Sequence, residues 1–294
     1  MKIRAGFAAR CARAAAIVAS VALGVQCSFT IDAEREQCST TADCRARGGE
    51  FAESVCKNSV CIADPAWSCS SEESGTDTEP SSKQFVVRIP VISVLNQQPI
   101  PGVTARMYRK IDVDAASPVG DPVASDANGI IELKVDSGYD GFLTLTHENI
   151  GPSLYFFNPP VRKNETVAPV RLASPAMVSA LFQQVGKTFD PTRGIVVLTA
   201  EDCTGAPAEG IAFDSTISDA NTQPFYSVDG LPTTSTEATD ASGYGGLIGL
   251  TPGTLAITGS RDLDTETPQT IGKLSLFVKA SSVSYSRMVP NGRK

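Results

Sequence analysis

The sequence predicts an all-β protein built from two tandem β-sandwiches, which follow a signal peptide and a small disulfide-rich module. Three observations point to this fold class. The 294 residues include 24 glycines and 19 prolines, which favour turns over long helices. Apolar residues alternate with polar ones in many short stretches, as in half-buried strands. One series of turns and strands also occurs twice, and the length suits roughly two domains of about 100–200 residues each.

Residues 1–26 are typical of a signal peptide. A basic start is followed by an apolar run from Ala14 to Val25. That run is shorter than the roughly 20 residues that a membrane-spanning helix needs. We therefore expect export and removal of this segment rather than a membrane span.

The end of this segment, Gly24-Val25-Gln26-Cys27, resembles a bacterial lipobox. It departs from the usual pattern, because Gly24 replaces the common Leu and Gln26 replaces a small residue. The resemblance implies a lipid on Cys27, and Ser28 then favours the outer membrane. The alternative is plain cleavage near residues 22–24, which leaves Cys27 as an ordinary thiol.

Residues 27–69 hold the anchor region and a cysteine-rich module. The cysteines that follow the signal region are Cys38, Cys44, Cys56, Cys61 and Cys69, with Cys203 far along the chain. An exported chain meets an oxidising compartment, so this spacing favours disulfides. Zinc is the competing interpretation, but the module has no CxxC pair and no nearby histidine. Because few apolar residues lie here, disulfides are expected to provide most of the stability.

The first four of these cysteines resemble the small knots of secreted multidomain proteins. For such a knot we expect Cys38 to pair with Cys56 and Cys44 with Cys61, although four cysteines allow three pairings and the sequence does not choose among them. If Cys27 carries a lipid, the two remaining cysteines make the count even. We therefore hypothesise a bridge between Cys69 and Cys203.

The rest of the chain divides by composition and pattern. The expected parts are a flexible acidic linker at 70–83, a first β-sandwich at 84–172, a connector with a short helix at 173–190, a second β-sandwich at 191–289 and a tail at 290–294. The linker has no large apolar group and cannot bury enough surface to become ordered. In the connector, Met177, Leu181, Phe182 and Val185 share one helical face, which predicts a helix packing on a sandwich.

The internal repeat rests on two turn motifs in the same order. Pro99–Val103 corresponds to Pro207–Ile211, and Asp126–Gly129 corresponds to Asp240–Gly243. In each copy, an alternating strand, a glycine turn and another strand follow the second motif. The stretch between the motifs differs, because Asp214–Thr239 in the second copy is longer than its counterpart in the first. We expect ligand-binding differences to lie there.

This pattern of P-x-x-G-[VI], then D-x-x-G and two strands, resembles the carboxypeptidase regulatory-like domain. The resemblance implies a transthyretin-like, Greek-key β-sandwich and says little about function. The whole arrangement, with Trp67-Ser68-Cys69 closing the module and Asp202–Gly205 opening the second sandwich, is similar to predicted lipoproteins of Gram-negative bacteria.

A search for chemistry yields no catalytic residue, metal site or cofactor. The only histidine is His147, which follows a strand and lacks the spacing of a zinc protease. Two groups of aspartates could bind calcium: Asp112, Asp114, Asp121 and Asp126, and Asp214, Asp219, Asp229 and Asp240. Neither group has an EF-hand order, and aspartates bonding the backbone of their own turns are the preferred interpretation.

Aromatic residues supply the remaining candidates. The side chains that could face a ligand are Tyr155, Phe156, Phe157, Phe225 and Tyr226. The alternative is a core position, which is usual for aromatic residues in strands. The net charge of −7 argues against a nucleic-acid partner.

Together these features favour a non-catalytic cell-envelope lipoprotein. We expect it to display its sandwiches to an envelope protein or a glycan, at the outer membrane or surface of a Gram-negative bacterium. The alternatives are an accessory domain of a secreted hydrolase, a cryptic hydrolase, or a structural envelope component. A periplasmic or secreted soluble location is the alternative to the lipid-anchored one.

Overall fold

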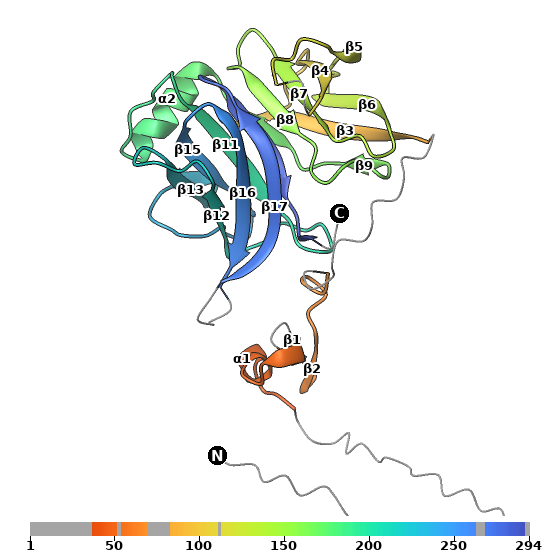
Figure 1. The fold of residues 1–294 in the computed structure, drawn as a ribbon, viewed down its shortest axis with the longest axis vertical. Coiled ribbons are helices and arrows are strands. Elements are labelled where there is room, and N and C mark those ends of the chain that lie inside the picture. The colour runs from red at the N-terminus through yellow and green to blue at the C-terminus, as the bar shows by residue number, and fades with distance from the viewer. Residues whose placement is uncertain (1–36, 52–53, 70–82, 111–112, 263–267, 292–294) are drawn as a thin grey trace, which may run out of the picture. The chain divides into compact units, whose positions relative to one another are not determined.

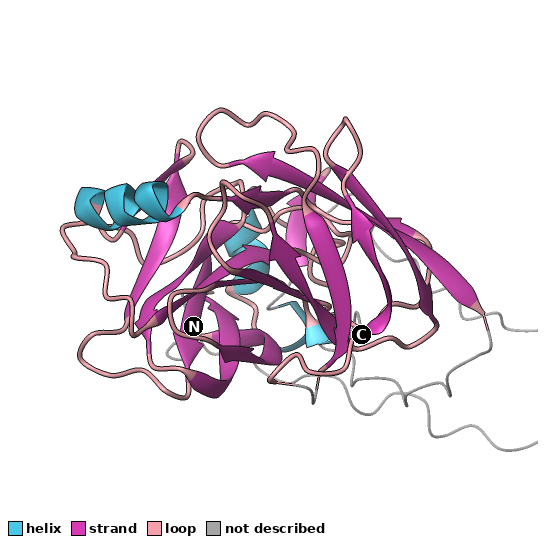
Figure 2. Cartoon of the chain, turned by 90° about the horizontal axis from the view of Figure 1, so that it is seen from above, coloured by secondary structure: helices cyan, strands magenta, loops and turns pink. Residues whose placement is uncertain are grey.

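The computed structural model describes residues 37–51, 54–69, 83–110, 113–262 and 268–291. The predicted signal peptide, Cys27 and nearly all of the predicted linker lie outside these ranges. Strands dominate the described residues and the helices are short (Figure 2), so the all-β prediction is confirmed. None of the helices in these ranges is long and apolar enough to cross a membrane.

The cysteine-rich module contains α1 (Thr41–Arg45), the 3-10 helix η1 (Gly49–Phe51), β1 (Ser54–Lys57) and β2 (Val60–Ala63). Thr40 caps α1, and the Asp43 carboxylate accepts hydrogen bonds from the backbone N–H groups of Ser39 and Thr40, both at 2.8 Å. These bonds lower the pKa of Asp43. The bridges Cys38–Cys56 and Cys44–Cys61 hold the module together, as predicted.

The first half of the β-rich region has eight strands. They are β3 (Gln84–Ser93), β4 (Thr104–Arg109), β5 (Val119–Ala124), β6 (Ile130–Asp136), β7 (Gly141–Thr146), β8 (Ser153–Phe156), β9 (Glu165–Thr166) and β10 (Val170–Leu172). One sheet has the order β10-β3-β6, with β9 also pairing with β3, and another run has the order β8-β7-β4-β5. In β6, Ile131, Leu133 and Val135 are buried and Glu132 and Lys134 are exposed, as the alternation predicts.

The second half begins with α2 (Pro175–Gln184) and continues with eight strands. They are β11 (Gly194–Ala200), β12 (Ile211–Ser215), β13 (Gln223–Val228), β14 (Leu231–Thr233), β15 (Tyr244–Leu250), β16 (Gly253–Arg261), β17 (Gln269–Val278) and β18 (Val283–Met288). The order β12-β16-β17 forms one sheet, and β14-β13-β15-β11-β18 forms a second run.

A single nine-stranded sheet joins the two halves (Figure 1). Strand β18 pairs in parallel with β11 on one side and with β8 on the other, which gives the order β14-β13-β15-β11-β18-β8-β7-β4-β5. The sequence predicted a connector between two separate sandwiches, between residues 172 and 191. This segment contains a helix, but the shared sheet continues from one half to the other.

The residues of this shared sheet face two cores alternately. In β11, Ile195 and Val197 belong to the core that contains the β10-β3-β6 sheet, whereas Val196 and Leu198 belong to the core that contains the β12-β16-β17 sheet. The first half also supplies Phe156 to the second core, where its ring meets Phe277 edge-on at 5.0 Å. Each core thus needs residues from both halves.

The internal repeat is visible in the hydrogen bonds of the two turn motifs. The Ser125 hydroxyl bridges the Pro99–Val103 segment, donating to a backbone carbonyl at 2.8 Å and accepting from an N–H at 2.9 Å. The Thr239 hydroxyl bridges the Pro207–Ile211 segment in the same way, at 2.7 and 3.0 Å. The two copies therefore share their turn chemistry as well as their strand order.

A glycine is required at the same point of each copy. Gly129 and Gly243 have φ angles of +71° and +66°. A Cβ atom would lie 2.6 Å from the Val91 carbonyl oxygen in the first copy and 2.4 Å from the Ala200 carbonyl oxygen in the second. Both the backbone conformation and the close approach therefore exclude a side chain.

Candidate functional site: an apolar cavity beneath α2

A cavity of about 370 Å³ lies between α2 and the neighbouring face of the shared sheet. Its walls come from four places: the β3–β4 turn, β10, α2 and strands β11, β13, β14, β15 and β18. The lining is mostly apolar. Cavities of this kind, with a few polar groups on an apolar wall, are typical of small-molecule sites.

Helix α2 forms one wall because its sequence is amphipathic. Ser174 caps the helix by accepting a hydrogen bond from the Met177 N–H at 3.3 Å, and Pro175 fits the first turn. Val178 and Phe182 are buried against the first core. The four residues that were predicted to share one helical face, namely Met177, Leu181, Phe182 and Val185, all line the cavity.

The opposite wall includes the hairpin of β13 and β14, which belongs to the longer stretch of the second copy. Val228 and Leu231 pair across a two-residue turn in which Asp229 and Gly230 have φ angles of +53° and +82°. Asp-Gly is a sequence typical of such turns, because both positions need positive φ. This dipeptide could have revealed the hairpin from the sequence, and our prediction missed it.

The mouth of the cavity carries two exposed leucines. Leu95 is 75% exposed and Leu231 is 59% exposed, and both line the cavity. They are the two most exposed large apolar side chains in the described part of the chain. Apolar groups gathered at an opening indicate an interaction site more strongly than single scattered ones do.

Six polar side chains interrupt the apolar wall, namely Gln97, Arg171, Gln184, Ser227, Tyr244 and Tyr285. The Arg171 guanidinium lies 4.6 Å from the centre of the Tyr244 ring, and the Tyr285 hydroxyl donates to the Arg171 carbonyl oxygen at 2.8 Å. Burial raises the pKa of both tyrosines, so both stay neutral at physiological pH. Ser227 is 3% exposed, and its hydroxyl has no hydrogen-bond partner among the described residues.

The structure separates the five predicted aromatic candidates. Phe225 lines the cavity. The other four, namely Tyr155, Phe156, Phe157 and Tyr226, are at most 3% exposed and lie in the two cores away from the cavity wall. These four occupy core positions, which is the alternative that the sequence analysis gave for them, because strands that face two cores bury aromatic residues on both sides.

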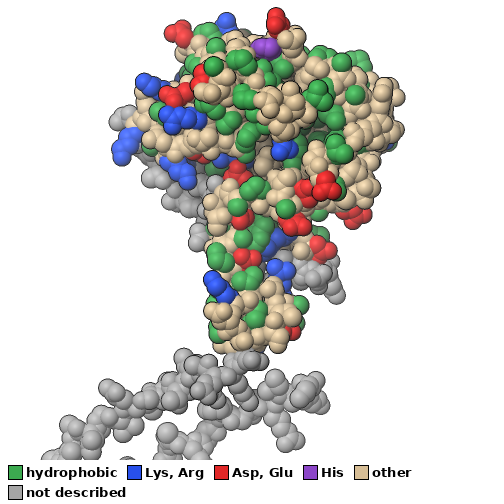
Figure 3. Space-filling view, turned by 180° about the vertical axis from the view of Figure 1, so that it is seen from behind, with side chains coloured by type: hydrophobic (Ala, Val, Ile, Leu, Met, Phe, Trp, Pro, Cys, Tyr) green, Lys and Arg blue, Asp and Glu red, His purple; other side chains and the backbone are tan. Residues whose placement is uncertain are grey.

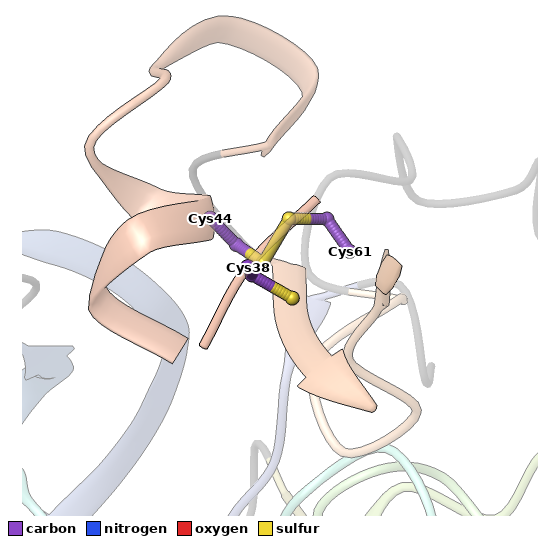
Figure 4. Close-up of side chains that lie close together, drawn as sticks. All are labelled: Cys38, Cys44 and Cys61. Carbon is purple, nitrogen blue, oxygen red and sulfur yellow. A yellow bond between two sulfur atoms is a disulfide. The ribbon is translucent and has the colours of Figure 1, made fainter. Parts of the chain in front are cut away.

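Three cysteine sulfur atoms lie close together in the module, but as disulfides. The sulfurs of Cys38, Cys44 and Cys61 lie within 4.8 Å of one another (Figure 4). Cys38 is bridged to Cys56, and Cys44 to Cys61. Since zinc binds the thiolate form of cysteine, the proximity reflects two packed disulfides rather than a metal centre.

The structure also joins Cys69 to Cys203. Beside this bridge, the Cys203 N–H donates to the Ala66 carbonyl oxygen at 2.9 Å, and the Arg261 guanidinium lies 4.3 Å from the centre of the Trp67 ring. These contacts attach the end of the module to the second half, as the long-range pairing hypothesis requires.

A buried charged cluster lies where the halves meet. Arg287 of β18 donates to both carboxylate oxygens of Glu165 on β9, at 3.1 and 3.2 Å, and lies 3.8 Å from Glu201. Burial raises the pKa of the neighbouring Tyr155 to about 12. The ion pair between Arg287 and Glu165 therefore links a strand of the second half to a strand of the first half.

His147 and several of the aspartate candidates lie in turns, whereas Asp121 lies in β5 and Asp214 in β12. His147 follows β7, and its Nδ1 accepts from the Asn149 N–H at 3.2 Å; in the described residues it has no hydrogen bond to a serine or aspartate. The carboxylates of Asp126, Asp219 and Asp240 each accept from the backbone N–H two residues ahead, at 2.8–2.9 Å. These are the turn contacts that the sequence favoured. Asp112 lies outside the described residues.

Charges of both signs occur on the surface. Lys and Arg side chains are interspersed with Asp and Glu on the face drawn in Figure 3. No broad basic face is visible there, in keeping with the net charge of −7. A surface of this kind serves solubility.

No family in the family comparison matches this chain, and no curated protein matches it. The resemblance to the carboxypeptidase regulatory-like domain therefore stays a prediction. Among solved structures, the chain is similar to the shaft pilin SpaA of Lactobacillus rhamnosus GG, with 13% identity, coverage of 71% of this chain and 98% of that one, and a TM-score of 0.25.

Two further structures show likeness at a similar level. The TIE protein of Bacillus anthracis is 12% identical over 70% of this chain, with a TM-score of 0.26, and the match spans about a third (34%) of its length. The major pilin BcpA of Bacillus cereus is 11% identical over 68% of this chain and 69% of its own, with a TM-score of 0.23. TM-scores this low carry no argument about function.

Proposed function

We propose that this chain is a non-catalytic, exported binding protein of the cell envelope, whose ligand site is the cavity beneath α2. The observation that carries this proposal is an apolar cavity of about 370 Å³ with two exposed leucines at its mouth. Small-molecule sites in proteins measure roughly 300–1,000 Å³ and are lined mainly by apolar and aromatic side chains. The cavity fits the lower end of that range.

The lining favours an apolar ligand over a glycan. Sugars carry many hydroxyl groups that need hydrogen-bond partners, and buried polar groups without partners are costly. Only a few of the lining side chains are polar. The ligand is therefore a small apolar molecule, and its supply at the envelope fits the expected lipid anchor at Cys27.

Blocking the mouth of the cavity tests this function. Ala180 is exposed on α2 and lines the cavity, whereas Ala176 is exposed on the same helix and does not. We expect Ala180→Trp to weaken binding of the neutral fluorescent probe N-phenyl-1-naphthylamine at least about tenfold, since a bulky ring fills part of the space. Ala176→Trp should bind like the wild type. Wild-type protein that binds no probe, or Ala180→Trp that binds it normally, would rule out the proposed site.

The location is tested separately. If Cys27 carries a lipid, Cys27→Ala should release the protein from membranes into the soluble fraction of fractionated cells. A matched Cys27→Ser variant should behave in the same way, because neither residue can be lipidated. Protein that stays with the membranes in both variants contradicts the lipobox interpretation and leaves the cavity unaffected.

A further inference from the structure

The cavity contains a single charged side chain. Of the residues that line it, Arg171 is the only one that carries a charge, and none is a carboxylate. This contrasts with the chain as a whole, whose net charge is −7. Building on the proposed function, we infer that the ligand is an apolar chain bearing one carboxylate, as in a medium-chain fatty acid, and that this carboxylate pairs with Arg171.

The guanidinium of Arg171 is held in place but not neutralised. It is half-buried, and its central carbon lies over the Tyr244 ring, 4.6 Å from the ring centre. A guanidinium carries five N–H donors in one plane and can bind a carboxylate through two hydrogen bonds. No carboxylate lies within ion-pair distance of Arg171 in the described part of the chain.

Other arginines of the sheets behave differently. Arg88 pairs with Glu132 at 2.8 Å, Arg193 with Asp219 at 2.9 Å, and Arg287 with its two glutamates. Arg171 differs from these three arginines, because it lines the cavity and pairs with no carboxylate of the described residues. A ligand carboxylate would complete the same pairing.

Ser227 provides an independent observation on the same wall. The residue is 3% exposed, and its hydroxyl has no hydrogen-bond partner in the described part of the chain, although most buried polar groups have one. A hydroxyl can donate or accept, so an oxygen atom of the ligand or a water bound with it would satisfy this group.

The size of the cavity limits the apolar part of the ligand. A volume of about 370 Å³ accommodates a single chain of medium length, and not a diacyl lipid. The exposed Leu95 and Leu231 at the mouth extend the apolar surface for any part of the chain that protrudes. Decanoate and 1-decanol, which share their chain and differ in charge, are therefore the probes of choice.

Calorimetric titration of the full mature chain with both probes tests the inference. We expect wild-type protein to bind decanoate at least about tenfold more tightly than 1-decanol, because hydrogen bonds to charged groups are stronger than hydrogen bonds between neutral groups. Arg171→Gln should weaken decanoate binding by about 10–100-fold and leave 1-decanol binding unchanged. Arg171→Lys, which keeps the charge, should retain part of the affinity and serves if the Gln variant fails to fold.

The control is Arg106→Gln, which makes the same charge change on an exposed position of β4 outside the cavity and should leave both affinities unchanged. Ser227→Ala should weaken decanoate binding while the melting temperature of the free protein stays the same or rises, since an unpartnered hydroxyl is removed. Equal binding of the two probes by wild type, or decanoate binding unaffected by both Arg171 variants, would overturn the carboxylate inference and leave the proposed function standing. Binding of neither probe would overturn both.

Discussion

The two copies of the repeat share one framework but place their extra strand differently. In the first copy, β5 follows β4 and pairs with it, so that it extends one end of the shared sheet. In the second copy, the β13–β14 hairpin crosses over and pairs with β15 instead, at the other end of the same sheet. The longer stretch thus changes sheets, and in doing so it forms a wall of the cavity.

The comparison shows which parts of the repeat are free to change. The turn motifs are matched bond for bond, because Ser125 and Thr239 occupy equivalent positions. The inserted stretch is tolerated because it attaches at a sheet edge. Each of the two outer strands also contains a proline, Pro122 in β5 and Pro232 in β14, which lacks an N–H and discourages pairing with a further chain.

The largest expected effect concerns the bridge that only the second copy has. Replacing Cys69 and Cys203 together by Ser should lower the free energy of unfolding by about 5 kcal/mol, because the bridge closes a loop of 134 residues. Removing Cys38–Cys56, with a separation of 18, should cost about 3 kcal/mol in the module. Urea unfolding measures both. An unchanged midpoint in the first variant would show that the second copy does not depend on the bridge.

The equivalent glycines give the next largest effect. Gly129→Ala and Gly243→Ala should each lower the free energy of unfolding by about 2–5 kcal/mol. The alanine would have to adopt a left-handed backbone conformation, and its Cβ atom would also clash with a backbone carbonyl oxygen. Gly102→Ala is the control, because its φ is +76° but a Cβ meets nothing within 4 Å, and it should cost about 1–2 kcal/mol. Thermal unfolding of the three variants provides the comparison, and widely different values for Gly129 and Gly243 would argue against equivalent turns.

The bridging hydroxyls should matter less. Ser125→Ala and Thr239→Val each leave a backbone N–H of the preceding motif without its hydroxyl partner, and each should cost about 1–3 kcal/mol. Thr146→Val, at an exposed position with a long 3.4 Å bond, should change stability by no more than about 0.5 kcal/mol. Similar losses of stability in the Ser125 and Thr239 variants would support the equivalence of the two copies, whereas a loss of stability in only one copy would contradict it.

The smallest effect is a pH dependence confined to the second copy. Hydrogen bonds from Arg193, followed by one from the Asn221 N–H, hold the pKa of Asp219 well below its usual range. The contribution of this pair is therefore present above the ordinary Asp pKa of about 3.9 and is lost as the pH falls through the lowered value. Asp219→Asn should remove this acid-dependent part from a pH titration of stability. An identical acid profile in the variant would mean that the pair does not stabilise the fold.

The fold was predictable where its signals are local. The turn glycines Gly129 and Gly243 and the alternation in β6 are local features of the sequence. From these features the strands and the repeat were predicted correctly. The shared sheet could not be predicted in this way, because the pairing of Val283 with Ser153 joins residues far apart in the chain and no local pattern specifies it.

The site was predictable in outline only. The apolar face of α2 and the unequal lengths of the two copies both pointed to the region that forms the cavity. The aromatic candidates were not separable, because composition does not tell which side of a two-faced strand a residue occupies, and Phe225 and Tyr226 are neighbours that face opposite cores. The separation of Arg171 from the carboxylates of the described residues depends on tertiary packing alone.

The central position of β18 has a consequence for the order in which the chain is completed. This strand lies between β8 and β11, yet it follows both of them in the sequence. During synthesis from the N-terminus onward, these two strands remain open edges until the last of their partners emerges. The first copy cannot finish folding alone, and any pause late in synthesis leaves both halves exposed to association with other chains.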